Sequence, residues 1–274
     1  MKKLLKLTAW IAGIIVVVLG IIFLIAWKSP KYYTLQQQHQ PYAYIPFKEY
    51  SGEHPRPYLV EKNNVLVLGA AHTRDPKHKE LALIETKWNA FKPTVALVEG
   101  RLGFLLPGIM DPVENLGEGG KVKELAHRDD VPLYNWDLSK EELARQMQTQ
   151  FSREQIAIAQ ILNPYFSQLR YGKPASPESF IQEYLKRAAY VELQDSIKTA
   201  QDVDRIWKKY FPDKDWREVT DEYGLPGYLG EMMAIGNDLR NQQLVAAIKE
   251  LTARGERVFV ICGSSHAVCV APAL

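Results

Sequence analysis

The chain has few cysteines, no solenoid-type internal repeat and no excess of positive charge outside its first residues. Cys262 and Cys269 are the only cysteines among 274 residues. Cys262 ends an apolar run, which favours a buried thiol over a disulfide with Cys269, so cysteine chemistry does not indicate the function. Beyond residue 31 the chain carries 29 basic and 32 acidic residues, a net charge of −3. This mildly acidic balance argues against a nucleic-acid partner.

Charge is also missing from a long stretch near the start of the chain. The 21 residues between Lys6 and Lys28 are uncharged, and a helix of that length matches a hydrocarbon core about 30 Å thick. A cleaved secretory signal is the alternative, but its apolar region is usually shorter, and "AWKSPKYY" offers no convincing small-residue cleavage site. Residues 1–31 are therefore predicted to be a single-pass membrane anchor with its flanks.

The lysines around this stretch predict its orientation. Three lysines precede the apolar run and Lys28 and Lys31 follow it, so the positive-inside bias favours a cytoplasmic N-terminus and an extracytoplasmic globular part. Residues 32–60 are rich in Pro, Gln and Tyr without a sustained period, which predicts an extracytoplasmic tether. Residues 61–274 are predicted to form the folded domain.

The pattern of apolar residues predicts the fold class of this domain. Short buried-strand patterns occur at 64–69, 94–100 and 131–137, with a helical pattern at 75–91, and the last strand is expected at 257–262. Residues 138–255 are mainly helical in pattern, with a long helix over 228–253. We therefore expect an α/β fold with a mostly parallel central sheet, flanking helices and a helical insertion. The last strand is expected beside the first.

Chemically useful side chains follow the predicted strands. Gly69 and Gly263 each end a strand, and His72 and His266 follow three residues later; Glu99 ends another strand, just before Arg101. Ligands of open parallel sheets bind at the carboxyl ends of the strands. Each residue alone has an ordinary explanation, such as a capping histidine or a local ion pair between Glu99 and Arg101. Asp137 follows a fourth strand, where a helix N-cap is the simpler reading.

Four segments together carry a family resemblance. "VLGAAH", "ALVEGR", "DLRNQQLVAAI" and "VFVICGSSHAV", in this order, resemble the TraB/GumN (Tiki-like) group, within the superfamily that includes erythromycin esterases and a haem-binding lipoprotein. The resemblance spans about residues 64–270. It implies an α/β fold with helical insertions and, for the Tiki branch, a metal-dependent peptidase outside the cell.

The resemblance also assigns residues to a site. Gly69 and His72 match the first Gly-x-x-His, Gly263 and His266 match the second, and Glu99 matches the strand-end acid. Arg240 matches the arginine of the Arg-Asn helix.

The expected chemistry follows from these side chains. His72, Glu99 and His266 form a three-ligand set for a divalent metal of unknown identity, which leaves a position for water. The metal would activate that water, and Arg240 or Arg101 would stabilise the developing negative charge on a peptide or other acyl substrate. A metal-free, esterase-like hydrolase with a histidine base is the first alternative. A non-catalytic haem- or peptide-binding protein is the second.

Overall fold

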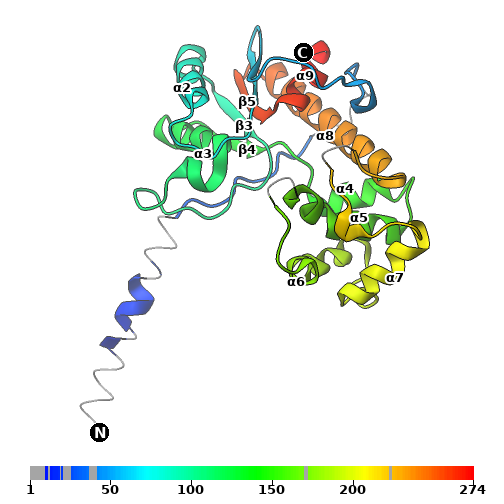
Figure 1. Ribbon diagram of the computed structural model, residues 1–274. Coiled ribbons are helices and arrows are strands. Elements are labelled where there is room, and N and C mark those ends of the chain that lie inside the picture. Colours follow the sequence, from blue (N-terminus) through cyan, green and yellow to red (C-terminus); the bar gives the residue numbers. More distant parts are fainter. Residues whose placement is uncertain are drawn as a thin grey trace. The chain divides into compact units, whose positions relative to one another are not determined.

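The computed structural model describes residues 10–11, 13–18, 20, 26–36, 42–169, 172–221 and 224–274 (Figure 1). The chain forms two compact units. Unit 1 comprises Met1–Ile45, Tyr50–Asp137 and Asn241–Leu274, and unit 2 comprises Pro46–Glu49 and Leu138–Arg240. The longer segment of unit 2 starts at Leu138, where the sequence predicts the helical insertion to start, and ends at Arg240 rather than at 255.

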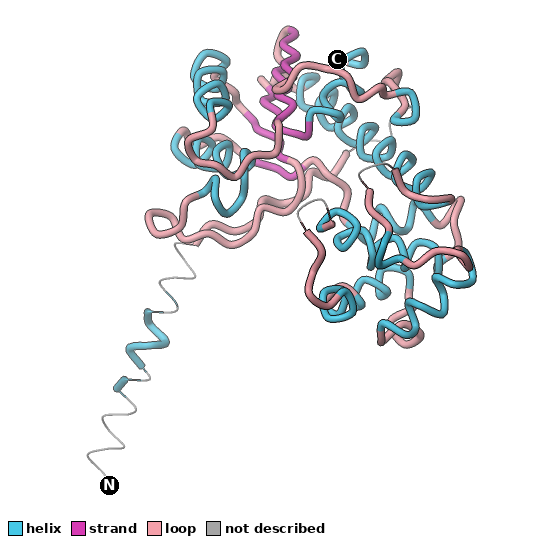
Figure 2. Tube along the Cα trace, viewed as in Figure 1, coloured by secondary structure: helices cyan, strands magenta, loops and turns pink. Residues whose placement is uncertain are grey.

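Unit 1 is built around a five-stranded sheet in the order β1-β2-β5-β3-β4. The strands, coloured magenta in Figure 2, are β1 (Tyr58–Lys62), β2 (Val65–Ala70), β3 (Val95–Val98), β4 (Leu133–Asn135) and β5 (Val258–Gly263). Only the β1–β2 pair is antiparallel; β2–β5, β5–β3 and β3–β4 are parallel. The prediction of a mostly parallel sheet with flanking helices is thus confirmed.

Both faces of the sheet are covered, as the continuous apolar strands require. Helices α2 (Lys79–Phe91) and α3 (Pro112–Arg128) cover one face (Figure 1). Leu66, Leu68 and Phe259 of the strands belong to one apolar cluster with residues of these helices. The other face packs against the C-terminal part of α8 (Tyr228–Ala253) and against α9 (Ser264–Val270). The sheet is consequently the buried centre of unit 1.

The first and last strands of the predicted parallel sheet lie side by side. In the β2–β5 pairing Gly69 is opposite Cys262 and Ala70 is opposite Gly263, which confirms the predicted neighbourhood. His266 lies in a helix rather than in a loop, because α9 begins at Ser264, directly after β5. His266 is therefore held by helix hydrogen bonds close to the end of the sheet.

Part of the predicted tether packs on unit 1. Tyr33 is 8% exposed, and its amide donates to the Asn135 carbonyl at 2.7 Å. Its hydroxyl donates to Glu250 at 3.1 Å. Burial, together with Glu250, raises the pKa of Tyr33 to about 12. The sequence of residues 32–60 has no pattern that predicts this contact of Tyr33.

Unit 2 is helical and packs around one apolar core. Its elements are η1 (Phe47–Glu49), α4 (Lys140–Met147), α5 (Arg153–Gln168), α6 (Pro177–Gln182), η2 (Leu185–Val191), α7 (Ala200–Tyr210), η3 (Trp216–Glu218) and the first half of α8. Serine or threonine side chains cap four of these helices: Ser139, Ser152, Ser176 and Thr199. The long helix predicted over 228–253 is confirmed as α8, which ends two residues before Gly255, a glycine with a φ of +84°.

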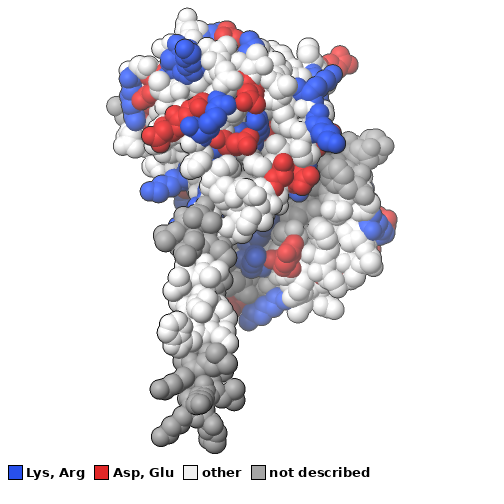
Figure 3. Space-filling view, turned by 90° about the vertical axis from the view of Figure 1, so that its left-hand side faces the viewer, with Lys and Arg blue, Asp and Glu red and all other residues white. Residues whose placement is uncertain are grey.

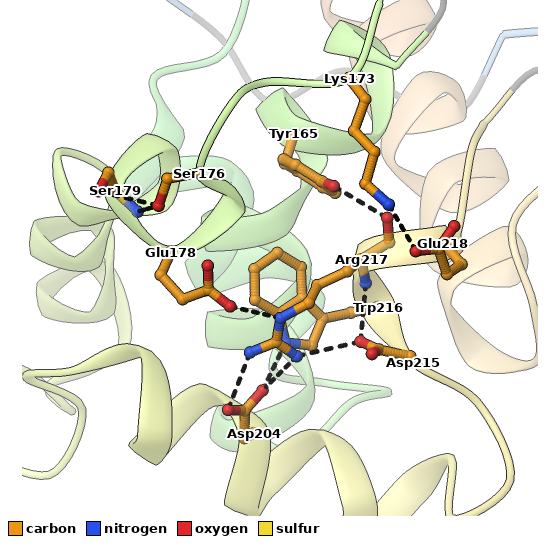
Figure 4. A network of polar contacts seen from close by, with 10 residues as sticks. All are labelled: Tyr165, Lys173, Ser176, Glu178, Ser179, Asp204, Asp215, Trp216, Arg217 and Glu218. Atoms are coloured by element: carbon orange, nitrogen blue, oxygen red, sulfur yellow. Dashed lines mark hydrogen bonds and ion pairs between the residues drawn. The ribbon is translucent and has the colours of Figure 1, made fainter.

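An arginine network ties three elements of unit 2 together (Figure 4). The Arg217 guanidinium donates to Asp204 on α7 at 2.9 and 3.0 Å and to Glu178 on α6 at 2.5 Å. Trp216 contributes its ring below the guanidinium, with the cation 4.3 Å from the ring centroid. These partners come from α6, α7 and η3, so the network fixes the packing of this end of unit 2.

The predicted anchor at 1–31 lies partly outside the described residues. Of its apolar run, residues 10–11, 13–18 and 20 are described as exposed helix and appear white in Figure 3, and Ala26 and Trp27 are described outside any helix. Within the described part of the chain, no helix combines the length and the apolar character needed to cross a membrane.

Candidate functional site

The candidate site begins with a close approach between β2 and α9. A Cβ built on Gly69 would lie 2.7 Å from the Ser264 Cα and 2.7 Å from the Ala267 Cβ. Backbone and a helical Cβ cannot yield to such a contact, so Gly69 is needed for packing. Because Gly69 has no side chain, α9 can begin in contact with the end of β2.

Glu99 and His266 meet at the end of β5. The Gly263 amide donates to Glu99 Oε2 at 2.6 Å, and His266 Nε2 lies 3.7 Å from Glu99 Oε1. A Cβ on Gly263 would fall 2.9 Å from His72 Nε2 and 3.5 Å from Glu99 Oε2. His72 and Glu99 therefore lie around the bare Cα of Gly263, and His266 faces Glu99.

Asn241 orients His266, and the sequence analysis did not single it out. Asn241 is fully buried, and its Oδ1 lies 2.7 Å from His266 Nδ1. Because an amide oxygen only accepts, Nδ1 carries the hydrogen and Nε2 is directed at Glu99. The Trp136 ring packs against the imidazole, with the ring centroids 5.4 Å apart. His266, 4% exposed, thus has a fixed orientation.

His72 lies in a loop held on both sides by buried carboxylates. Its φ is +64°, in the left-handed region that a histidine rarely adopts. Glu80 accepts from the Ala71 amide at 3.2 Å, and Glu118 accepts from the Thr73 amide at 2.5 Å. Two glutamates from different helices therefore fix the backbone on either side of His72.

Both supporting glutamates are buried, at 1% exposure for Glu80 and 5% for Glu118. Burial, followed by the charge of Glu118, raises the pKa of Glu80, and the Ala71 amide partly opposes this. Glu118 reaches the loop because α3 is broken at Gly117, whose φ of +63° turns the chain. A glutamate inside a helical pattern resembles an ordinary surface residue, so neither role is predictable from the sequence.

A pocket of about 260 Å³ opens beside these groups. His72, Glu99 and Glu118 line it together with glycines and apolar residues of β2, β5 and α3. The pocket combines an imidazole with two carboxylates, the side chains used for general acid-base chemistry and as ligands of divalent metals. In the described part of the chain, no three His, Cys, Asp or Glu side chains are already arranged as a metal-binding group.

The remaining predicted residues are placed differently. Arg101 is exposed in the loop after β3. Arg240 belongs to unit 2, where its Nη1 donates to Asn237 Oδ1 at 3.1 Å. The N-cap reading of Asp137 is wrong, because Ser139 caps α4 by accepting from the Glu142 amide at 3.1 Å. Asp137 itself is buried, at 7% exposure.

The cysteines do not take part in this site as a disulfide. Cys262 and Cys269 are both buried as thiols, as the apolar run before Cys262 predicts. Cys262 contributes to the wall of the pocket.

Comparisons of the chain with protein-family models, with curated proteins and with solved structures found no match.

Proposed function

We propose that the protein is a membrane-anchored hydrolase that cleaves a peptide or other acyl bond with water activated by His72, Glu99 and His266. The convergence of these three side chains at the end of β5 is the observation that supports it most. These residues are 27 to 194 positions apart in the chain, yet His72 and Glu99 line one pocket and His266 faces Glu99. Such a cluster beside a cavity is the usual mark of a reactive site.

The metal version of this function uses the three side chains as ligands. A divalent ion held by His72, Glu99 and His266 would lower the pKa of a bound water and polarise the substrate carbonyl. A histidine that binds a metal through one ring nitrogen usually donates a hydrogen bond from the other. His266 Nδ1 makes such a hydrogen bond with Asn241. In residue type, the donor set is one that such an ion takes.

A metal-free version is favoured by one specific contact. With Nδ1 held by Asn241, His266 Nε2 faces Glu99 at 3.7 Å. This Asn-His-Glu arrangement orients a histidine base that would take a proton from water, with Glu99 stabilising the imidazolium that results. Arg101 is the proposed group for the developing negative charge in both versions. Arg240, to which the resemblance gives the same role, belongs to unit 2.

The family and the location belong to the same proposal. The four segments that resemble the TraB/GumN (Tiki-like) group include the strand ends and the helix of Asn241, and the observed mostly parallel sheet agrees with that resemblance. The uncharged run ahead of Lys28 is proposed to span the membrane once, with the N-terminus cytoplasmic and the globular part outside.

The test uses the full chain in detergent or liposomes, purified without chelators. Elemental analysis and hydrolysis of a panel of peptides and acyl esters are measured for the wild type and for His72→Ala, Glu99→Gln and His266→Ala. His127→Ala is the matched control, because His127 is exposed in the same unit and outside the pocket. His78 would be a poor control, since it caps α2.

The outcomes separate the versions. Loss of both metal and hydrolysis in the three variants supports the metal version, and loss of hydrolysis from a metal-free protein supports the second. A Soret band in the wild type would support the haem-binding alternative instead. Hydrolysis that survives all three substitutions would overturn the proposed site.

A further inference from the structure

The most exposed large apolar side chains outside the N-terminal run lie on one loop. Among the described residues beyond that run, only Phe104 (53%) and Ile109 (79%) are more than half exposed; Leu59 and Met233 follow at 37% each. Both belong to residues 101–111, between β3 and α3. Exposed apolar side chains that are grouped on one short segment, rather than scattered singly, indicate a contact surface.

This loop is structured, so its apolar side chains are presented by a fixed backbone. Leu102 and Leu105 are buried at 5% and 0% exposure. The amides of Ile109 and Met110 donate to the Leu106 carbonyl at 3.2 and 2.9 Å, which closes a turn. Leu102 and Leu105 therefore point into unit 1, whereas Phe104 and Ile109 are exposed.

The loop is fastened to the residue that ends the uncharged run. The Trp27 amide donates to the Leu105 carbonyl at 2.8 Å, and the Leu105 amide donates back at 3.2 Å. Next to this pair, Lys123 Nζ of α3 donates to the Lys28 carbonyl at 2.7 Å and lies 5.6 Å from the Trp27 ring centroid. Residues on both sides of the end of the run are thus held against unit 1.

The charges near the loop suit a bilayer surface. Residues 100–110 contain no acidic residue, and Asp111 at the end of the loop caps α3. Lys28, Lys31 and Arg101 are exposed. By contrast, acidic and basic side chains alternate over α2 and α3 (Figure 3), in pairs such as Lys121 with Glu85. Apolar side chains beside basic ones, next to a tryptophan, are the composition of segments that lie in the headgroup region.

We propose that the loop of residues 101–110 is a second membrane contact, in which Phe104 and Ile109 enter the lipid interface beside the end of the anchor. The proposal rests on the anchor proposed above, because Trp27 would then lie at the interface and the loop is bonded to it. The partner is a phospholipid bilayer, and anionic headgroups would pair with the exposed lysines and Arg101.

The first experiment uses the wild-type chain in liposomes of phosphatidylcholine and phosphatidylglycerol that contain a lipid with a photoactivatable group in its acyl chain. Mass spectrometry locates the lipid adducts after illumination. Adducts are expected in the uncharged run and in residues 101–110.

The second experiment measures depth at single positions. Phe104→Cys and Ile109→Cys are labelled with an environment-sensitive fluorophore, which is selective because both native cysteines are buried. Ala253→Cys is the matched control, since Ala253 is exposed in unit 1 at the end of α8. Labels at 104 and 109 are expected to emit at shorter wavelength and to be quenched several-fold more strongly by nitroxide lipids than the label at 253.

The results distinguish the loop from the anchor. Adducts in the run but not in 101–110, with all three labels quenched equally, would overturn the loop contact and leave the anchor in place. Adducts in neither segment would overturn both. The hydrolytic site is tested separately, because neither experiment depends on activity.

Discussion

The two units differ in what they bury. All the buried polar and charged side chains found among the described residues lie in unit 1: Glu80, Glu118, Lys123, Asn135, Asp137, Asn241, Glu250, Ser264 and His266. The core of unit 2 is apolar, from Leu143 on α4 to Met232 on α8. Burying a polar group costs free energy unless the group is hydrogen-bonded. Buried polar side chains are therefore expected to have a structural or functional role. Five of the nine (Glu80, Glu118, Asn241, Ser264 and His266) surround or support the candidate site.

Unit 2 places its charges at the surface instead. The partners of Arg217 are all partly exposed, from 37% for Asp204 to 53% for Asp215. Its stability should therefore depend on apolar packing, while the stability of unit 1 should depend also on the ionisation of buried groups. Substitutions in each unit can test this difference.

The largest effect is expected from the unit 2 core. Trp207 is 1% exposed, lies 4.4 Å from Phe211 between ring centroids and donates from Nε1 to the Lys214 carbonyl at 2.8 Å. Trp207→Ala should lower the free energy of unfolding by about 3 to 5 kcal/mol, because it leaves a cavity. Urea denaturation followed by circular dichroism measures this loss. A loss below about 1 kcal/mol would mean that the apolar core does not carry the stability of unit 2.

A pH dependence is expected from Lys123 in unit 1. Burial lowers the pKa of this lysine from 10.5 to about 8. Below about pH 8 the folded protein buries a charge; between about 8 and 10.5 it releases the proton before the unfolded chain does. The wild type should therefore gain up to roughly 3 kcal/mol of stability over this range relative to Lys123→Met. Parallel unfolding curves at several pH values check the difference, which a constant offset between the two proteins would contradict.

The buried amide at the site offers a narrower test. Asn241→Leu keeps the volume but removes the oxygen that holds His266 Nδ1. Hydrolysis, or metal affinity if a metal is bound, should fall about 10- to 100-fold. Asn241→Asp retains an acceptor and should restore part of it, with a shifted pH profile. Equal activity in all three proteins would show that Asn241 has no positioning role.

The smallest effect is expected from the exposed charges of unit 2. Arg217→Met should cost about 1 to 2 kcal/mol, since several partly exposed carboxylates lose their partner, and the loss should shrink at high salt. Arg145→Met is the control, because Arg145 is 69% exposed and pairs only with neighbouring residues of its own helix. A similar cost for both variants would show that the Arg217 network adds nothing beyond ordinary surface pairs.

Local patterns in the sequence determined the strands, the long helix and the approach of distant residues. The apolar runs at 64–69 and 257–262 predicted β2 and β5, and the parallel arrangement predicted that His72, Glu99 and His266 would meet. These features follow from periodicity and from the common edge at which parallel strands end.

Tertiary structure alone decided which residues support the site. Glu118 and Asn241 lie inside helical patterns, where a polar residue reads as solvent-facing, and only the packing of helices on the sheet buries them. The contact of Tyr33 with Glu250 and the pairing of Trp27 with Leu105 join segments far apart in the chain. Periodicity records which face of an element is apolar, but it does not record which distant element covers that face, and the covering element decides which polar groups lose water and find a partner.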